Sequence, residues 1–233
     1  MKRFLLTSQM IYNQSIAKSL ARMLEKPFSE SGVAYIITSH NAADPEEDKS
    51  WFVKNLNSLY NLGWKNFYII DVAGSNGLPK NDWMSQIEQS DVIVMGGGSN
   101  YFLSYWLEES GLMSALPKIL ETKIYVGASA GSMVLQPKIV TSSNAIDLFK
   151  AGNWDIDLDN LGPEGRRSAK SLNLIDFMIR PHYTKDLDAI LSEISDKFKT
   201  KLYALDDNSA LEIIGDQVNV ISEGEYKIFE PKA

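Results

Sequence analysis

The sequence predicts an α/β protein with a mostly parallel central sheet flanked by helices. As far as Pro137, short apolar runs alternate with longer amphipathic segments. The runs are apolar on both alternating positions, which is typical of parallel strands buried on both faces. The segments between them carry apolar residues three and four positions apart, as amphipathic helices do. This alternation indicates an α/β fold, and we expect a single domain over residues 1–233.

The first elements follow one another without a long interruption. Each apolar run is rich in Ile, Val, Tyr or Phe, and a helical pattern follows each of the first four. We expect strands at 3–8, 34–39, 67–72, 92–98 and 124–129, and helices within 15–28, 48–63, 81–90 and 100–121.

The pattern loosens after Pro137. Residues 141–170 are polar and weakly periodic, and long irregular segments in compact domains are often functional. We expect a C-terminal β-hairpin over 220–231, with Gly224 near its turn. Regular structure returns at 174–183 with a strand, followed by a helix near 185–198 and two or three further strands within 201–224.

The composition excludes several kinds of function. The chain has no cysteine, so disulfides, thiolate metal sites and cysteine nucleophiles are excluded. A net charge of −7 repels phosphate backbones, and we expect no nucleic-acid partner. No stretch approaches the roughly 20 apolar residues that span a bilayer, and the N-terminal apolar run is too short for a signal peptide. We expect a cytoplasmic protein with no membrane partner. The absence of an H-E-x-x-H motif favours a site without metal or cofactor.

Ser129 stands where a strand runs into a helix, within "KIYVGASAGSMVL" (123–135). A serine hydroxyl becomes a nucleophile when a base takes its proton and donors stabilise the oxyanion. The flanking glycines let strand and helix approach closely, and the helix start places the Ala130 N–H beside the hydroxyl. The alternative is a structural one, since serine is also a common helix N-cap.

Three glycines at 96–98 close the preceding strand. They expose N–H groups, so Gly98 or Gly97 is the expected second oxyanion donor. We expect Gly97 and Tyr101 to border the substrate, while the other aromatic residues of 100–113 pack in the core. A dinucleotide-binding G-x-G-x-x-G pattern would need glycine where Tyr101 stands.

His182 is the expected general base for Ser129. It follows a buried-looking strand in "FMIRPHYTK", where Pro181 forces an extended backbone before a loop. Strand ends of this type carry the catalytic groups of α/β folds. His40, the other histidine of the chain, also ends a predicted strand and is the weaker candidate.

Together these residues resemble the peptidase E family, which contains aspartyl dipeptidase and, more distantly, cyanophycinase. The motifs "GGGSNYFL", "GASAGSMVL" and "IRPHYTK" occur in that order, "LYALDDNSAL" fits the strand that follows, and the resemblance spans 65–215. It implies a serine peptidase on a fold similar to class I glutamine amidotransferases. Ser129 carries over as nucleophile, His182 as base, and the N–H groups of Gly98 and Ala130 as the oxyanion hole. The implied substrates are short peptides, typically with an N-terminal aspartate.

The sequence departs from the family pattern at the third member of the triad. The aspartate that follows the nucleophile in aspartyl dipeptidase is replaced here by Asn144. An amide can orient an imidazole but does not match a carboxylate in stabilising imidazolium. Asp147, Asp206 and Asp207 are the other candidates, and we place Asn144 first and Asp207 second.

A second departure concerns specificity. Aspartyl dipeptidases carry an arginine soon after the histidine to hold the substrate carboxylate, and the segment after His182 has none here. Arginine grips a carboxylate better than lysine does. The candidate replacements are Arg180, Lys185, Arg166 and Arg167.

Three functions are therefore compared. The first is hydrolysis of short peptides through an acyl-enzyme on Ser129. The second is a cyanophycinase-like hydrolase or an esterase that uses the same site. The third is a non-catalytic peptide- or metabolite-binding homologue, suggested by the missing acidic residue at Asn144.

Overall fold

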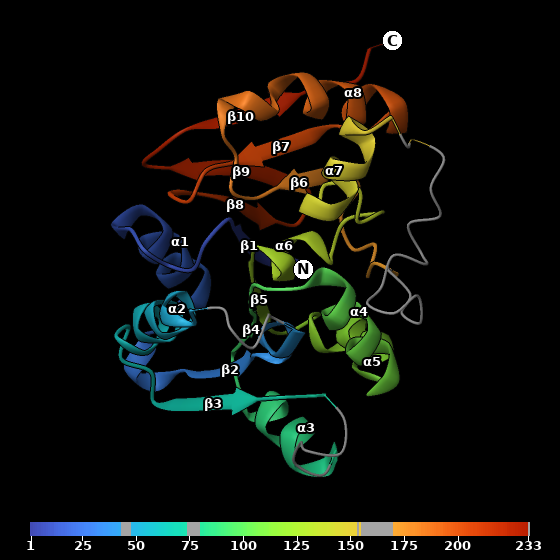
Figure 1. Cartoon of the computed structure of the whole chain (residues 1–233). Helices are drawn as coiled ribbons and strands as arrows, with labels where there is room; N and C mark the ends of the chain where they lie inside the picture. Colours follow the sequence, from blue (N-terminus) through green and yellow to red (C-terminus); the bar gives the residue numbers. More distant parts are fainter. Residues whose placement is uncertain (43–47, 74–79, 153, 155–169, 233) are drawn as a thin grey trace.

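A computed structural model describes residues 1–42, 48–73, 80–152, 154 and 170–232 (Figure 1). The fold contains one large sheet and one small sheet. In the large sheet the strand order is β3-β2-β4-β5-β1-β8-β9; the first five strands are parallel, β8 runs antiparallel to β1, and β9 runs antiparallel to β8. These strands are β1 (Arg3–Thr7), β2 (Gly32–Ile36), β3 (Asn66–Ile70), β4 (Val92–Met95), β5 (Ile124–Ala128), β8 (Ser209–Ile214) and β9 (Gln217–Ser222).

The central strands are buried on both faces. In β4, Val92 and Val94 belong to the core on one side of the sheet, whereas Ile93 and Met95 belong to the core on the other side. None of these four side chains is exposed to solvent. The mostly parallel sheet and its two-sided burial confirm the fold class predicted from the apolar runs.

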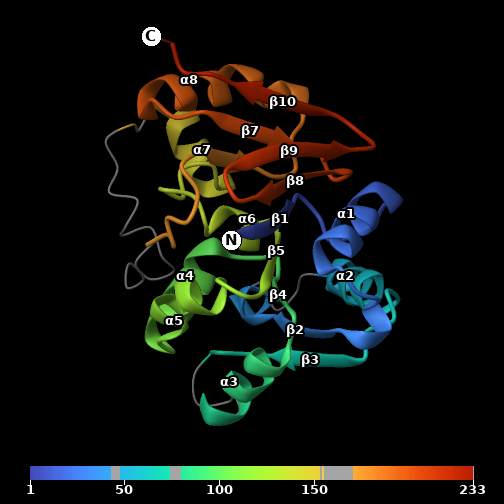
Figure 2. The ribbon, with the colours of Figure 1, turned by 180° about the vertical axis from the view of Figure 1, so that it is seen from behind.

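Helices cover both faces of the large sheet. Side chains of α1 and α2 pack in one core and side chains of α3, α4 and α5 in the other. The opposite views show where these helices lie around the sheet (Figures 1 and 2). The segment 100–121 forms two helices, since Gly111 has a left-handed φ of +77°. The helices are α1 (Gln14–Leu24), α2 (Ser50–Tyr60), α3 (Lys80–Gln89), α4 (Asn100–Glu109) and α5 (Leu112–Ile119), with short 3₁₀ turns η1 (Phe28–Glu30) and η2 (Thr38–Ala42).

The small sheet lies near the C-terminus of the chain (Figure 2). Its order is β10-β7-β6, in which β6 and β7 run parallel and β10 runs antiparallel to β7. Helices α7 and α8 pack with it in a separate core. The elements of this part are α7 (Ser143–Lys150), β6 (Met178–Arg180), η6 (Lys185–Leu187), α8 (Asp188–Phe198), β7 (Leu202–Leu205) and β10 (Tyr226–Phe229). The short helix α6 (Ala130–Met133) follows β5 and contacts both sheets.

The C-terminal hairpin lies one strand earlier than expected. It is formed by β8 and β9, whereas β9 and β10 belong to different sheets, so the prediction of a hairpin turn at Gly224 is wrong. The Asp206 carboxylate accepts a hydrogen bond from the Glu225 N–H at 2.6 Å and packs so closely on Gly224 that a Cβ there would clash. This contact lies between the end of β7 and the segment that joins β9 to β10.

None of the helices in the described ranges has both the length and the apolar character that crossing a bilayer requires.

Candidate active site

Ser129 lies in a strained turn between β5 and α6. Its φ of +49° and ψ of −108° are unusual for a residue with a side chain. The strand and the helix approach so closely in this turn that only glycine fits at position 127. A Cβ on Gly127 would lie 2.7 Å from the Gly131 carbonyl oxygen. The turn is held from both sides, since the Ser129 N–H donates to Thr7 O and the Ser132 and Met133 N–H groups donate to Ser129 O.

His182 faces the Ser129 hydroxyl. Its Nε2 atom lies 3.0 Å from Ser129 Oγ, and its side chain is 42% exposed. The residue follows β6 and Pro181 and has a positive φ of +54°. A backbone conformation of this kind in a residue with a side chain is a sign of a functional constraint.

Asp207 contacts the other ring nitrogen of His182. The Asp207 Oδ1 atom lies 2.6 Å from His182 Nδ1. The hydrogen bond from His182 is the largest cause that lowers the pKa of Asp207 from its ordinary value, against the opposing effect of burial. An ionised carboxylate only accepts hydrogen bonds, so the proton lies on Nδ1. The lone pair of a neutral imidazole then lies on Nε2, directed at the serine.

The pairing of β6 with β7 explains why these two residues meet. The strands are parallel, and Arg180 at the end of β6 pairs with Ala204 in β7. Both strands therefore end at the same edge of the small sheet, where His182 and Asp207 follow.

Ser8 joins the backbone of His182 to the Asp207 carboxylate. Its Oγ accepts a hydrogen bond from the His182 N–H at 2.7 Å and donates to Asp207 Oδ1 at 3.0 Å. Gln9 donates to the second carboxylate oxygen, with Nε2 at 3.2 Å from Oδ2. Sequence reasoning missed both residues because they lie in the loop after β1, with no motif of their own.

Asn144 does not take the place at the imidazole. It is the second residue of the helix α7 and lines the pocket beside Ser129, while Asp207 accepts the hydrogen bond from His182. The preference for Asn144 over Asp207 is therefore wrong for this contact. Asp206 holds the turn before β8, where its carboxylate accepts a hydrogen bond from Ser209 Oγ at 2.6 Å.

The glycine turn Gly96–Gly98 lies next to Ser129. It follows β4, which is the parallel neighbour of β5, with Met95 opposite Gly127. A Cβ added to Gly97 would lie 3.3 Å from Ser129 Cβ. Gly98 has a φ of +121°, a conformation that favours glycine.

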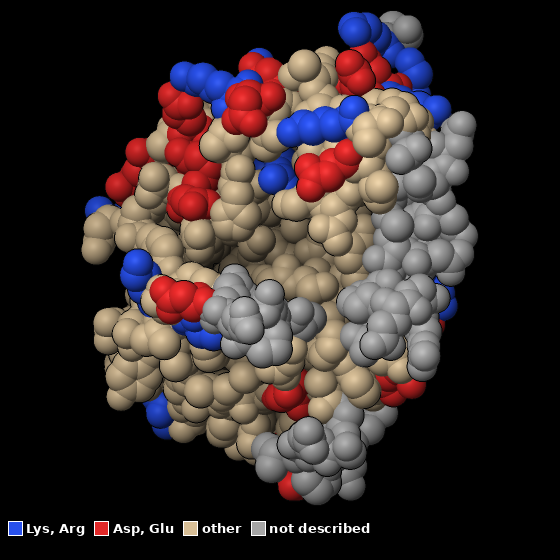
Figure 3. All heavy atoms as spheres, in the orientation of Figure 1, with Lys and Arg blue, Asp and Glu red and all other residues tan. Residues whose placement is uncertain are grey.

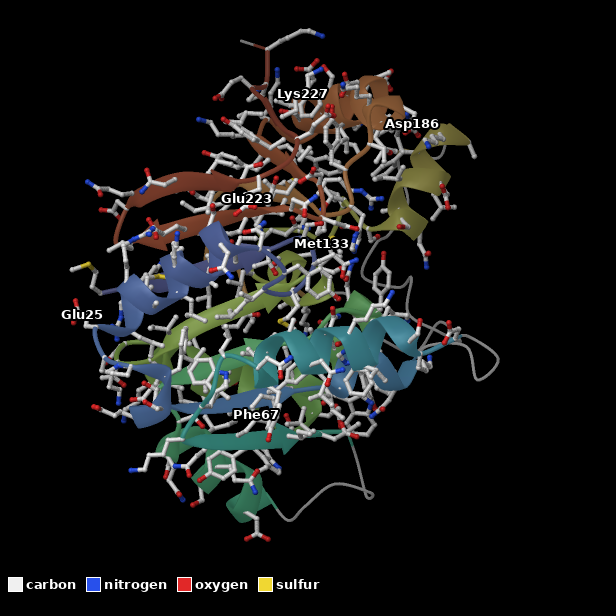
Figure 4. All side chains as sticks on the ribbon, turned by 90° about the vertical axis from the view of Figure 1, so that its left-hand side faces the viewer. Glu25, Phe67, Met133, Asp186, Glu223 and Lys227 are labelled. Carbon is white, nitrogen blue, oxygen red and sulfur yellow. The ribbon has the colours of Figure 1, made fainter. Side chains whose placement is uncertain are left out.

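A pocket of about 440 Å³ contains Ser129 and His182. Figure 3 shows the surface hollowed near the centre of this face, in the region of α6 in Figure 1. In Figure 4, Met133, which lines the pocket, lies between α2 and the C-terminal elements. The lining residues come from both sheets and their loops: Ser8, Gln9, Trp51, Asn55, Gly97, Gly98, Ser99, Asn100, Tyr101, Ala128, Ser129, Met133, Ser142, Ser143, Asn144, Arg180, Pro181 and His182.

Arg180 and Tyr101 both reach this pocket. Arg180 Nη1 donates to Thr141 O at 2.9 Å, and its Nε is buried without a hydrogen-bond partner. The Tyr101 hydroxyl lies 3.2 Å from Ser142 Oγ. Lys185 pairs instead with Glu225 at 3.0 Å. The candidates Arg166 and Arg167 lie outside the described residues.

His40 lies apart from the serine, in an aromatic cluster. It is 6% exposed and stacks on Trp51 with ring centroids 4.9 Å apart. Its Nδ1 donates to Ile37 O at 2.7 Å, and burial lowers its pKa to about 4. The ring is therefore neutral and committed to packing at neutral pH. Among the described residues, no three His, Asp or Glu side chains gather in a way that would hold a metal ion.

A family comparison covers nearly all of this architecture. Residues 4–221 match the model of peptidase family S51. The chain belongs to that family. The names of its relatives confirm the resemblance to peptidase E, because several of them are called peptidase E.

Three curated relatives match this S51 chain at low identity. The uncharacterised peptidase Lmo0363 of Listeria monocytogenes is 28% identical over 58% of the chain and 62% of the relative. Peptidase E of Streptomyces coelicolor is 25% identical over 69% of the chain and 63% of the relative. The uncharacterised peptidase YgaJ of Bacillus subtilis is 33% identical over 60% of the chain and 54% of the relative. The matched part of the chain thus spans between about half and two thirds of the length of these relatives.

Two solved structures share the fold. A Listeria monocytogenes structure provisionally named as a peptidase E protein has a TM-score of 0.68 at 22% identity, covering 96% of this S51 chain and all of its own. A peptidase from an acI-B1 actinobacterium has a TM-score of 0.64 at 14% identity, and the match covers 100% of this S51 chain and 96% of the actinobacterial chain. At these identities the likeness concerns the fold alone.

Proposed function

We propose that this S51 chain is a serine peptidase that hydrolyses short peptides through an acyl-enzyme on Ser129. One observation carries the proposal: Ser129 Oγ, the His182 ring and the Asp207 carboxylate form a continuous hydrogen-bonded chain with distances of 3.0 and 2.6 Å. That chain opens into the pocket. It has the geometry that a nucleophile, its base and an orienting group need.

In the first half of the reaction, Ser129 Oγ attacks the substrate carbonyl carbon while its proton passes to His182 Nε2. The carbon–nitrogen bond then breaks, and the leaving amine takes that proton from His182. The products of this half are a free amine and an ester on Ser129. In the second half, water gives a proton to His182 and attacks the ester. The acid leaves, and Ser129 recovers its proton.

Asp207 supports the base in both halves. Its carboxylate holds Nδ1 protonated, so that Nε2 is free to accept, and it stabilises the imidazolium that forms after proton transfer. Its lowered pKa keeps it ionised at neutral pH. The presence of this carboxylate removes the argument for a non-catalytic homologue, which rested on Asn144.

The developing oxyanion is stabilised by backbone N–H groups. We assign the N–H of Ala130, the first residue of α6, and the N–H of Gly98, with Gly97 as its neighbour along the glycine turn. Both segments border the pocket at Ser129, as the lining shows for Gly97 and Gly98.

The pocket suits a short peptide with an acidic residue on the acyl side of the scissile bond. A volume of about 440 Å³ lies towards the small end of ligand pockets. Arg180 supplies a guanidinium in the lining, and guanidinium groups bind carboxylates in a bidentate manner. Tyr101 borders the same region. A cyanophycinase-like hydrolase or an esterase would use the same serine, so the substrate panel below separates these activities.

The test is a panel of dipeptides, a β-linked aspartyl–arginine dipeptide and simple esters, assayed with wild type and two variants. Ser129→Ala removes the nucleophile. Ser132→Ala is the matched control, because its buried hydroxyl donates to Thr7 O at 2.8 Å in the same turn. We expect dipeptide hydrolysis by wild type and Ser132→Ala and none by Ser129→Ala. Equal turnover by all three proteins would refute the assignment of Ser129.

A further inference from the structure

We propose that Ser39 is a positioning residue that fixes the two peptide planes Gly96–Gly97 and Gly97–Gly98, so that the N–H groups of Gly97 and Gly98 face the oxyanion. The inference rests on the proposed function, because it concerns the oxyanion hole of that site. Ser39 itself does not line the pocket, and it lies in η2, far from Ser129 in the sequence.

The Ser39 hydroxyl is placed against two carbonyl groups of the turn. Its Oγ lies 2.6 Å from Gly97 O and 2.9 Å from Gly96 O, and the side chain is fully buried. Carbonyl oxygens only accept, so the serine is the donor in both contacts. The hydroxyl therefore holds both oxygens on the side of η2.

These bonds determine where the following N–H groups point. In a trans peptide the C=O and the next N–H point in opposite directions, and no described peptide bond is cis. With Gly97 O turned to Ser39, the Gly98 N–H points away from Ser39. Gly97 packs on the other side against Ser129, where a Cβ would lie 3.3 Å from Ser129 Cβ. The turn thus lies between Ser39 and the nucleophile, with the N–H groups of Gly97 and Gly98 on the nucleophile side.

A glycine turn needs such a constraint. Glycine populates positive and negative φ about equally, so a peptide plane between two glycines rotates readily. A rotated plane would place a carbonyl oxygen, rather than an N–H, where negative charge develops. The Ser39 main chain adds a second constraint. Its carbonyl accepts from the Ser99 N–H at 3.1 Å and packs so closely on Gly98 that a Cβ there would clash.

The test measures how fast a fluorophosphonate probe labels Ser129, because the phosphoryl oxygen of this probe occupies the oxyanion hole during attack. Ser39→Ala removes the hydroxyl. Ser195→Ala is the matched control: Ser195 is equally buried, and its Oγ donates to two carbonyls, Thr200 O at 2.8 Å and Phe229 O at 3.2 Å, on the far side of the small sheet. Both variants lose the same kind of hydrogen bonds, so thermal unfolding should respond similarly.

We expect Ser39→Ala to label about 10- to 100-fold more slowly than wild type, less than the roughly 10²- to 10³-fold loss of a whole oxyanion donor. Ser195→Ala should label at the wild-type rate. The pH dependence of labelling should keep its midpoint in Ser39→Ala, because His182 and Asp207 are not touched. Equal rates in Ser39→Ala and Ser195→Ala, whether unchanged or equally slowed, would overturn the inference.

Two further proteins complete the design. Ser39→Cys keeps the shape of the side chain, with a somewhat larger terminal atom, but donates weakly, so it should also label slowly. Labelling at the wild-type rate would count against Ser39, including in the case that Ser39→Ala does not fold. Ser129→Ala tests the proposed function separately. If it labels as fast as wild type, or if wild type does not label, the proposed function fails and this inference with it. If wild type is labelled and Ser129→Ala is not, the proposed function holds, and the labelling rates of the Ser39 variants test this inference.

Discussion

His182 Nδ1 lies 2.6 Å from Asp207 Oδ1, while the opposite ring nitrogen lies 3.0 Å from Ser129 Oγ. The three residues come from the ends of three strands in two sheets. The parallel pair β6–β7 brings the base and the carboxylate together, and the tight turn after β5 presents the hydroxyl to them.

The first prediction concerns Asp207. Asp207→Asn should lower kcat by up to about 10⁴, since an amide can donate to Nδ1 and leave the imidazole in the wrong tautomer. Steady-state hydrolysis of the best dipeptide measures this effect. Asn144→Ala is the control, because that residue lines the pocket without the imidazole contact; its kcat should change by less than about threefold. A loss in Asn144→Ala as large as in Asp207→Asn would restore Asn144 as the orienting residue.

The expectation that Asn144 rather than Asp207 contacts the imidazole shows what a single sequence can and cannot predict. The strand that runs into "GASAG" and the strand that ends before Pro181 are local patterns, so Ser129 and His182 were found from residues close to them. The contact between His182 and Asp207 depends on which strands are neighbours. The motif "LYALDD" ends in the carboxylate, but only the pairing of β7 with β6 shows that this strand end meets the histidine.

The C-terminal strands show the same limit. The periodicity of 217–229 predicts strands, and strands form there. It does not show that β9 and β10 enter different sheets, because β10 pairs with β7, a strand that is distant in the sequence. Ser8, Gln9 and Ser39 were missed for a related reason: each acts through a hydrogen bond to a distant loop.

The second prediction concerns Ser8 and Gln9. Each donates to the Asp207 carboxylate, and these bonds are among the causes that hold the pKa of Asp207 low, so Ser8→Ala and Gln9→Ala should both raise it towards its ordinary value of 3.8. Titration of the Asp207 carboxyl carbon by NMR measures the change. Only Ser8 also accepts the His182 N–H, so Ser8→Ala should reduce kcat more than Gln9→Ala does. Equal rates in the two variants would show that the backbone contact is unimportant for activity.

The third prediction concerns the stability of the fold in acid. Burial lowers the pKa of His40 from 6.5 to about 4, so the unfolded chain binds a proton in that interval and the folded chain does not. This histidine therefore contributes stability that is complete above pH 6.5 and is lost as the pH falls towards 4, by at most about 1.4 kcal/mol per pH unit. His40→Gln should remove this contribution. Urea unfolding of both proteins at several pH values measures it, and parallel curves from pH 7 to 4 would contradict the assignment.

The fourth prediction concerns Arg180. Arg180→Lys keeps the positive charge but loses the bidentate grip, so kcat/KM for dipeptides with an acidic residue on the acyl side should fall about 10- to 100-fold. Neutral dipeptides should be affected less than about threefold. Lys185→Ala is the control, because Lys185 pairs with Glu225 and is 75% exposed. If Lys185→Ala loses the preference for acidic dipeptides and Arg180→Lys keeps it, Lys185 rather than Arg180 binds the substrate carboxylate.

The most direct measurement for the central claim is intact-protein mass spectrometry of samples quenched in acid during turnover of an activated short-peptide ester. We predict a mass increase equal to one acyl group, mapped to Ser129 by digestion, and absent from both Ser129→Ala and His182→Ala. Rapid ester hydrolysis with an acyl group on another residue, or undiminished turnover in the Ser129→Ala variant, would contradict the account.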